Sequence, residues 1–167
     1  MSVEEHKREA PTAVACGVIT ISDTRTKETD KSGALIKEKL GEKNFKVVEH
    51  VIVKDEKEVI LEAVQRLIND ERIEAVITNG GTGLAKRDVT IETVTPLFEK
   101  EIVGFGELFR MLSYQEDIGS AALLSRAAAG VVKNTALFSL PGSSGAVKLA
   151  MDKLIIPELA HVIKHIK

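Results

Sequence analysis

The sequence has 167 residues, of which 44% are hydrophobic and 29% charged, as expected of a single globular domain. This composition excludes a disordered chain and a collagen-like chain. The formal net charge of −2 gives no basic footprint for a phosphate backbone, so we expect no nucleic-acid partner. Cys16 is the only cysteine and cannot form an intramolecular disulfide, which fits a small core residue in a reducing compartment.

No stretch approaches the roughly 20 apolar residues that cross a bilayer, so we expect no membrane partner. The first residues, MSVEEHKREAPT, are too polar for a secretory signal, and we expect a cytoplasmic protein. We predict a flexible tail over residues 1–12 that ends near Pro11, followed by one domain over residues 13–167.

Strand and helix patterns alternate along this domain. Unbroken apolar runs are typical of parallel strands that are buried on both faces, whereas apolar pairs spaced by four residues, as from Val59 to Ile68, predict an amphipathic helix. A further helix is predicted over residues 34–40, with Gly41 as its C-terminal cap. The predicted strands are residues 13–22, 45–53, 75–78 and 135–140.

The later part of the chain is mostly helical in pattern. Prolines and glycines between Thr90 and Ala129 predict several short helices there, and the helix that begins near Ser143 is expected to be interrupted at Pro157. The alternation of strands and helices predicts an α/β fold, a three-layer α/β/α sandwich with a mainly parallel central sheet.

Ligands bind open α/β sheets beyond the carboxyl ends of the strands. The four predicted strand exits are rich in small, acidic and hydroxyl residues, which makes them candidate binding segments. They are Ser22-Asp23-Thr24, Lys54-Asp55-Glu56, Asn79-Gly80-Gly81-Thr82-Gly83 and Pro141-Gly142-Ser143-Ser144.

The glycine-rich exit is the most informative of the four. Gly80, Gly81 and Gly83 remove side-chain bulk and allow positive φ, so that successive N–H groups could converge on a phosphate. The pattern is neither a Walker A loop nor a dinucleotide-binding fingerprint, and a tight turn without a ligand is the alternative interpretation.

Two carboxylates are placed to share the site of that loop. Asp55 leaves a neighbouring strand and Asp88 follows the glycines closely, which points to Mg²⁺ held against a nucleotide. The structural alternative is that Asp55 caps the next helix, and that Asp88 caps the helix near Thr90 or pairs with Lys86 or Arg87.

Three further segments allow two interpretations each. The Pro141–Ser144 exit could hold a second phosphate, or Ser143 could be an ordinary helix cap. His161 and His165 lie one helical turn apart without a third ligand nearby, so we expect surface residues rather than a metal site. Residues 105–114 carry more apolar area than one helix face buries in a monomer, which favours a subunit contact.

Five segments in series, GVITISDT, TNGGTGLAKRDVT, GFGELFRMLS, LLSRAAAGV and LFSLPGSSGAV, resemble the MoaB/MogA family of molybdenum-cofactor biosynthesis. The resemblance spans about residues 13–165, and GFGELFRMLS with LSRAAAGV is more similar to the MoaB branch. It implies a MogA-like activity, in which AMP is transferred from Mg·ATP to the terminal phosphate of molybdopterin with release of pyrophosphate. Mg²⁺ is the implied cofactor and ATP the cosubstrate.

The family motifs assign roles to residues of this chain by position. The implied catalytic carboxylates are Asp55 and Asp88, which we expect to organise Mg²⁺ around the triphosphate. The sequence does not identify the atoms that bind the metal. The implied substrate-binding residues are Ser22, Asp23, Thr78, Gly80, Gly81, Thr82, Gly83, Ser113, Ser125, Arg126, Pro141, Gly142 and Ser143.

The chain departs from the MogA-like pattern at Lys54, at Thr78-Asn79, at Ile91 and at PGSS (residues 141–144). Most of these departures are MoaB-like. Some MoaB-branch proteins lack one or both acids and catalytic activity, so the retention of both favours an active enzyme. The alternatives are a catalytically silent molybdopterin-binding or assembly protein and a regulatory nucleotide-binding oligomer. The resemblance also implies a homo-oligomer, a hexamer rather than a trimer, and other molybdenum-cofactor biosynthesis proteins as partners.

Overall fold

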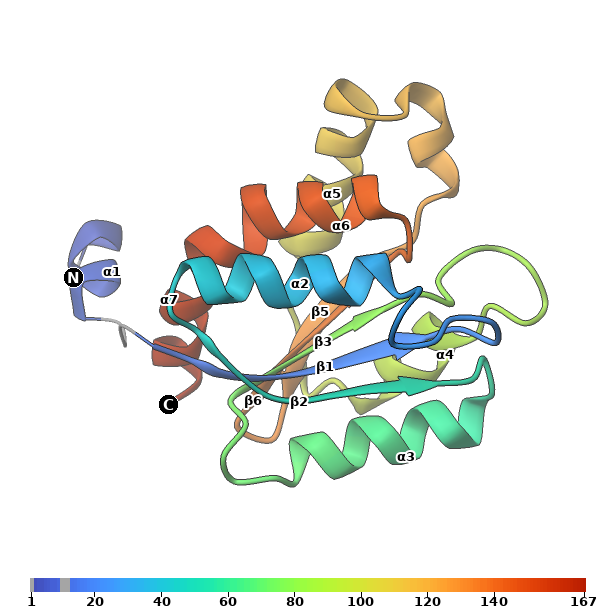
Figure 1. Cartoon of the computed structure of the whole chain (residues 1–167). Helices are drawn as coiled ribbons and strands as arrows, with labels where there is room; N and C mark the ends of the chain where they lie inside the picture. Colours follow the sequence, from blue (N-terminus) through green and yellow to red (C-terminus); the bar gives the residue numbers. More distant parts are fainter. Residues whose placement is uncertain (1, 10–12) are drawn as a thin grey trace.

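The computed structural model of the chain describes residues 2–9 and 13–167. The predicted tail ends at Pro11, which lies outside the described residues. Within the expected tail, Val3–Glu9 form a helix, α1, that lies beside α7 (Ile156–Ile166). Figure 1 shows both termini at the same end of the molecule.

A central sheet organises the described residues, with six strands in the order β2-β1-β3-β6-β5-β4. Strands β2, β1, β3 and β6 are parallel to one another, whereas β5 is antiparallel to both β6 and β4. The four predicted strands are confirmed, and β4 and β5 were not predicted. The strands are β1 (Ala15–Ile21), β2 (Lys46–Val53), β3 (Ala75–Asn79), β4 (Lys100–Glu101), β5 (Ala128–Val132) and β6 (Thr135–Leu140).

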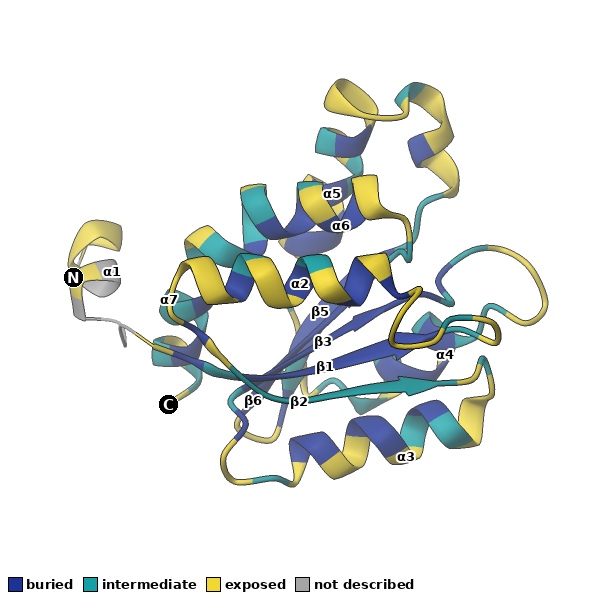
Figure 2. Cartoon of the chain, viewed as in Figure 1, coloured by how far each residue is buried: buried dark blue, intermediate teal, exposed yellow. Residues whose placement is uncertain are grey.

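Helices cover both faces of this sheet, which confirms the predicted three-layer α/β/α sandwich (Figure 1). Each face has its own apolar core, and the inner strands between the two cores are buried almost throughout, whereas the outer strands β2 and β4 are not (Figure 2). One face carries α2 (Lys31–Glu42), α5 (Val103–Glu116), α6 (Ser144–Ala150) and α7, and the other carries α3 (Lys57–Ile68) and α4 (Thr90–Val94).

Cys16 lies in the first of these cores, as expected of a small core residue. Its side chain is fully buried, and burial raises the pKa of the thiol to about 12. The thiolate, which is the reactive form of cysteine, is therefore suppressed at neutral pH.

The bounds of α2 differ from the prediction at both ends. The helix begins before residue 34 because the side chain of Asp30 accepts a hydrogen bond from the backbone N–H of Gly33 (2.9 Å). Gly41 lies inside the helix rather than at its C-terminal cap, so that prediction was wrong. The chain turns instead at Asn44, which takes the left-handed conformation with φ of 60°.

The segment from Thr90 to Ala129 is only partly divided into short helices. Besides α4, it contains short 3₁₀ helices at Thr95–Leu97 and Gly119–Leu124. α5, however, is one helix of 14 residues with Gly104 in its first turn, because buried Phe105 and Phe109 anchor it in the core.

The predicted interruption near Pro157 is confirmed. A π-helical segment, Met151–Ile155, joins α6 to α7, and Pro157 lies in the first turn of α7. No helix in the described part of the chain has both the length and the apolar character needed to span a membrane.

Candidate functional site

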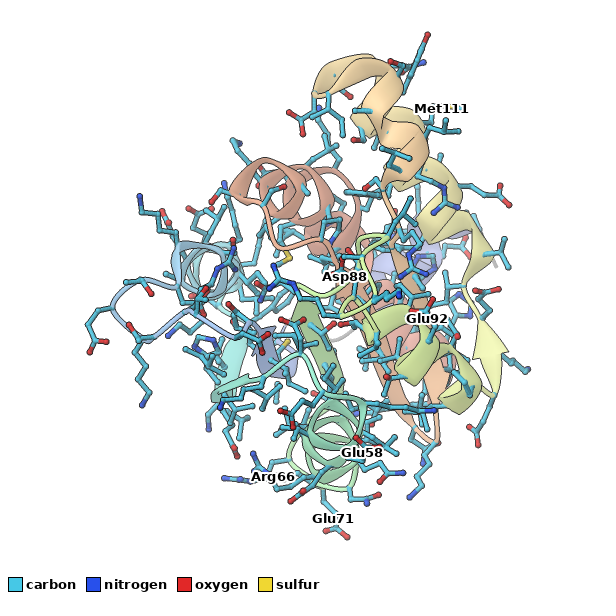
Figure 3. The ribbon with its side chains drawn as sticks, turned by 90° about the vertical axis from the view of Figure 1, so that its right-hand side faces the viewer. Glu58, Arg66, Glu71, Asp88, Glu92 and Met111 are labelled. Carbon is cyan, nitrogen blue, oxygen red and sulfur yellow. The ribbon has the colours of Figure 1, made fainter. Side chains whose placement is uncertain are left out.

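The four strand exits identified in the sequence line one cavity of about 510 Å³. They meet because β2, β1, β3 and β6 are adjacent and parallel, so their carboxyl ends lie at the same edge of the sheet. Figure 3 faces this edge, with Asp88 near the centre of the view and the exposed α3 residues Glu58 and Arg66 below it. All the predicted site residues line the cavity except Asp23 and Thr78.

The glycine loop takes a conformation that only glycine adopts easily. Gly80 and Gly81 have φ of 103° and 70°. A Cβ on Gly80 would lie 2.2 Å from the carbonyl oxygen of Ile21, and one on Gly81 would lie 2.3 Å from Oγ1 of Thr90. That hydroxyl donates a hydrogen bond to the Gly80 carbonyl (2.9 Å). The loop is thus a tight turn that also forms part of the cavity wall.

Asp55 does not cap α3, contrary to the structural alternative. The N-cap position belongs to Glu56, whose side chain makes no cap hydrogen bond. The backbone N–H of Asp55 donates to Oδ1 of Asp23 (3.0 Å), and its own Oδ1 faces the glycine loop, 2.9 Å from where a Cβ of Gly81 would lie.

The Oδ1 atom of Asp55 is buried and has no hydrogen-bond partner among the described residues. Burial raises the pKa of this carboxyl, and the nearby charges of Asp23 and Asp88 raise it further. A buried carboxylate oxygen without a partner is costly unless a cation or a proton joins it. The site is therefore poised to bind one of the two.

Asp88 approaches the glycine loop from its other end. Its Oδ2 lies 2.7 Å from where a Cβ of Gly83 would be, and it accepts a hydrogen bond from the backbone N–H of Ala85 (3.0 Å). The N-cap of α4 is Val89, so Asp88 does not cap that helix. Its structural role lies within its own turn, and it leaves a carboxylate at the cavity.

Arg126 holds the glycine loop through backbone carbonyls. Its Nε donates to the carbonyl of Thr82 (2.8 Å) and its Nη2 to that of Gly83 (2.7 Å). The same guanidinium makes a two-pronged ion pair with Glu92 of α4, which lowers the pKa of that carboxyl. Arg126 lines the cavity, but most of its donors serve the loop and Glu92.

The remaining predicted residues fall into two groups. Thr78 is fully buried beneath the cavity, where its hydroxyl donates to Oγ of Ser139 (2.9 Å). Ser113 and Ser125 line the wall near the end of α5. Ser143 lines the cavity too, and its Oγ accepts from the backbone N–H of Ala146 (3.2 Å), which confirms the helix-cap interpretation.

Comparison with known proteins assigns this architecture to a family. Residues 17–161 match the family described as "Probable molybdopterin binding domain". The chain belongs to this molybdopterin-binding family. It is 64% identical to molybdenum cofactor biosynthesis protein B of Bacillus subtilis (strain 168) over 167 residues, which cover 100% of this chain and 98% of the relative. The predicted membership of the MoaB/MogA family is confirmed.

Solved structures of similar proteins share the fold. A crystal structure of a molybdenum cofactor biosynthesis protein B is 59% identical, with a TM-score of 0.92 over 95% of this chain and 98% of the other. The tungsten cofactor synthesizing protein MoaB from Pyrococcus furiosus is 42% identical, with a TM-score of 0.84 over 93% and 98%. A MogA structure is 26% identical, with a TM-score of 0.82 over 92% and 99%.

Sequence reasoning missed some residues that this molybdopterin-binding domain places in the cavity wall, among them Arg25, Arg87 and Asp117. Arg25 and Arg87 lie in polar loops without periodicity, and Asp117 follows the last residue of α5. Their only signal is closeness in sequence to a strand exit or to a motif. Arg87 directly precedes Asp88, and Arg25 comes three residues after Ser22.

The two aspartates of this domain have the donor chemistry that Mg²⁺ requires. Mg²⁺ prefers oxygen ligands and is commonly held by one or two carboxylates together with substrate phosphates. The unpartnered Oδ1 of Asp55 fits such an ion. No cluster of three or more His, Cys, Asp and Glu side chains among residues 2–9 and 13–167 could hold a metal on protein ligands alone, so water or substrate oxygens would complete the coordination. His161 and His165 lie outside this cavity, on α7.

Proposed function

We propose that the protein is a molybdopterin adenylyltransferase of molybdenum-cofactor biosynthesis. The family match and the relatives named above support the pathway. The observation that carries the reaction is the convergence of Asp55 and Asp88 on the glycine loop, with one carboxylate oxygen buried and unpartnered. Two acids beside a phosphate-binding loop suit a reaction in which Mg²⁺ neutralises a triphosphate.

The reaction joins two polyanions, so it depends on positioning and charge neutralisation more than on a protein nucleophile. A phosphate oxygen of molybdopterin attacks the α-phosphorus of ATP, a new P–O bond forms, and the bond to pyrophosphate breaks. Bound Mg²⁺ supplies the neutralising charge for the triphosphate. The N–H groups of Gly81, Thr82 and Gly83 are the donors we assign to the α-phosphate, because the N–H of Gly80 donates to the carbonyl of Leu140 (3.0 Å). Arg126 holds their loop in shape.

The direct test is incubation of the purified protein with molybdopterin, ATP and Mg²⁺, followed by detection of adenylyl-molybdopterin and pyrophosphate. We expect both products in equal amounts. Binding of molybdopterin without an adenylated product would instead identify a catalytically silent molybdopterin-binding or assembly protein. Nucleotide binding that ignores molybdopterin would identify a regulatory nucleotide-binding protein.

We further propose that the protein is a homo-oligomer, a hexamer in preference to a trimer, which meets other molybdenum-cofactor biosynthesis proteins. The hexamer and the further partners follow from the MoaB-like resemblance, and self-association is supported by exposed apolar residues on α5 and the 3₁₀ helix after it, namely Leu108, Met111, Tyr114 and Leu123. Met111 projects outward at the top of Figure 3, and Leu123 is 86% exposed. Isolated apolar residues are common on surfaces, but Leu108, Met111 and Tyr114 recur every third residue along one side of α5, and a group of this kind is typical of an interface.

Light scattering tests this second proposal. The wild type should scatter as a hexamer, and Met111→Glu should scatter as a smaller species because a charge in an apolar interface is costly. Gln65→Glu, at an exposed position of α3, adds the same charge away from this surface and should leave the mass of the oligomer unchanged. A monomeric wild type would contradict the proposal.

A further inference from the structure

Arg25 is a fixed cation in the cavity wall. Its Nη2 donates to the carbonyl oxygen of Gly142 (2.8 Å), just after β6, and its Nη1 donates to Oδ1 of Asn79 (3.4 Å), the last residue of β3. The guanidinium has five N–H donors, and these two acceptors within the described part of the chain leave donors for a ligand. The side chain is 30% exposed, on a wall of the cavity.

Asp30 supports Arg25 from the protein interior. Its side chain is 1% exposed, and Oδ1 lies 3.8 Å from Nη1 of Arg25. Oδ2 accepts a hydrogen bond from the hydroxyl of Thr20 (2.6 Å), and that hydroxyl in turn accepts one from Nδ2 of Asn79 (3.1 Å). Asp30 is therefore linked to Arg25 directly and also through Thr20 and Asn79.

Arg25 is the cation that balances the charge of Asp30. The other nearby basic group, His50, has its Nε2 atom 3.2 Å from Oδ2 of Asp30. Burial is the main cause that lowers the pKa of this imidazole, and the charge of Lys37 lowers it further, whereas Asp30 itself raises it; the net direction is downward, so His50 takes up a proton less readily than an ordinary histidine. A buried carboxylate requires a charged or hydrogen-bonded partner, and here the charged partner is Arg25.

The cavity wall carries Asp55 and Asp88 beside the glycine loop, where Arg87 also lies, and Arg25 beside Gly142, where Asp117 lies near α6. Asp55 and Asp88 adjoin the glycine loop and α4, on the sheet face that α3 also covers. Arg25 contacts Gly142, and Asp30 caps α2, on the face that α2 and α6 cover. A triphosphate that carries Mg²⁺ suits the carboxylate side, whereas a phosphate without its own metal suits the side with the fixed arginine.

On the basis of the proposed function, we propose that Arg25 binds the terminal phosphate of molybdopterin and that Asp30 is the positioning residue that fixes Arg25 for this contact. Arginine suits this task because its planar fork can serve protein acceptors and a phosphate at once. Asp30 touches no substrate and acts only through the orientation of the guanidinium.

The first test is Arg25→Gln in the full chain, with equilibrium binding of molybdopterin measured in the absence of ATP. We expect the Kd for molybdopterin to rise about 10- to 100-fold, the range of a lost hydrogen bond to a charged group. The Kd for Mg·ATP should stay within about twofold. Arg25→Lys keeps the charge but loses the fork, so its Kd for molybdopterin should lie between those of the wild type and Arg25→Gln. An unchanged Kd for molybdopterin, or an equal rise in both Kd values, would overturn the assignment.

The second test is Asp30→Asn, alone and combined with Arg25→Gln. Asn can still accept the hydrogen bond from Gly33, so α2 keeps its cap. We expect the single change to weaken molybdopterin binding but not Mg·ATP binding, and the double variant to bind molybdopterin no worse than Arg25→Gln. Additive losses, or a loss of binding for both ligands, would show that Asp30 has only a structural role.

The matched control is Arg66→Gln on α3, where the arginine pairs with Glu49 outside the cavity (Figure 3). This variant should bind both ligands as the wild type does. Because binding is measured without turnover, the outcome is separate from that of the proposed function. A wild type that binds molybdopterin but forms no adenylate would refute the transferase, whereas a wild-type affinity in Arg25→Gln would refute only the role of Arg25.

Discussion

The carboxylate of Asp55 and the backbone of Gly81 are in close juxtaposition, with Oδ1 lying 2.9 Å from where a Cβ on Gly81 would be. This relationship joins two segments that are separate in the sequence, the exit of β2 and the loop after β3. It gives a structural reason for glycine at position 81, which has positive φ and also has an aspartate against its Cα.

Gly81→Ala should therefore damage both the fold and the site. The methyl group would collide with Thr90 and Asp55, and alanine would have to take a backbone conformation with positive φ. We therefore expect a loss of about 1–3 kcal/mol in the free energy of unfolding. Mg·ATP binding should weaken as well, because the Asp55 carboxylate must move. Urea unfolding and equilibrium binding measure the two effects.

Gly104→Ala is the matched control for that change. A Cβ at position 104 meets nothing within 4 Å, and the residue lies in the first turn of α5. Alanine there should stabilise the protein by up to about 1 kcal/mol and leave binding unchanged. If the two alanine variants had the same free energy of unfolding and the same affinity for Mg·ATP, the close contact between Gly81 and Asp55 would contribute to neither.

Asp88→Asn separates the chemical role of this residue from its structural one. Asn can still accept the hydrogen bond from the backbone N–H of Ala85, so the melting temperature should change little. The charge that would hold Mg²⁺ is lost, and we expect the rate of adenylyl transfer to fall about 100-fold or more. Retained activity together with a lower melting temperature would mean that Asp88 only stabilises its turn.

The raised pKa of Asp55 makes stability depend on pH. A carboxyl whose pKa is higher in the folded state binds protons more tightly there, so stability falls as pH rises from the unfolded pKa of 3.8 through the folded value. Asp55→Asn removes this effect and should unfold at higher urea concentration than the wild type at pH 7 in EDTA. The difference should shrink as pH falls and vanish below about pH 3, because the wild-type carboxyl is then protonated in both states. An advantage of equal size at both pH values would contradict this origin.

The gathering of the four strand exits could be predicted from the sequence, because the carboxyl ends of adjacent parallel strands share one edge. The helix-cap role of Asp55 could not be judged in the same way. Spacing alone fits a cap, but the structure aims this side chain at Gly81, a contact made only in three dimensions. Arg25 was missed because its loop has no periodicity, and its place is set by acceptors at positions 79 and 142.

Strand β5 shows a different limit of sequence reasoning. Its residues, AAGVV, include small residues with weak strand preference, and the strand follows a segment of helical pattern. Its place depends on tertiary packing, since a Cβ on Gly130 would lie 2.3 Å from the ring of Phe98. The absence of a Cβ at position 130 is thus explained by an aromatic residue far away in the sequence, and no local pattern reports such a contact.

Arg126 and Glu92 form an ion pair whose two members should contribute unequally. Glu92 is mostly exposed, so Glu92→Gln should cost less than about 1 kcal/mol of stability. Arg126→Ala also removes the donors to the carbonyls of Thr82 and Gly83 and should cost about 1–3 kcal/mol, with a clear rise in the Kd for Mg·ATP as the glycine loop loosens. Urea unfolding and nucleotide titration of both variants provide the measurement. Equal losses of stability in the two variants would assign the stabilisation to the ion pair. A larger loss in Arg126→Ala assigns it to the hydrogen bonds with the loop carbonyls.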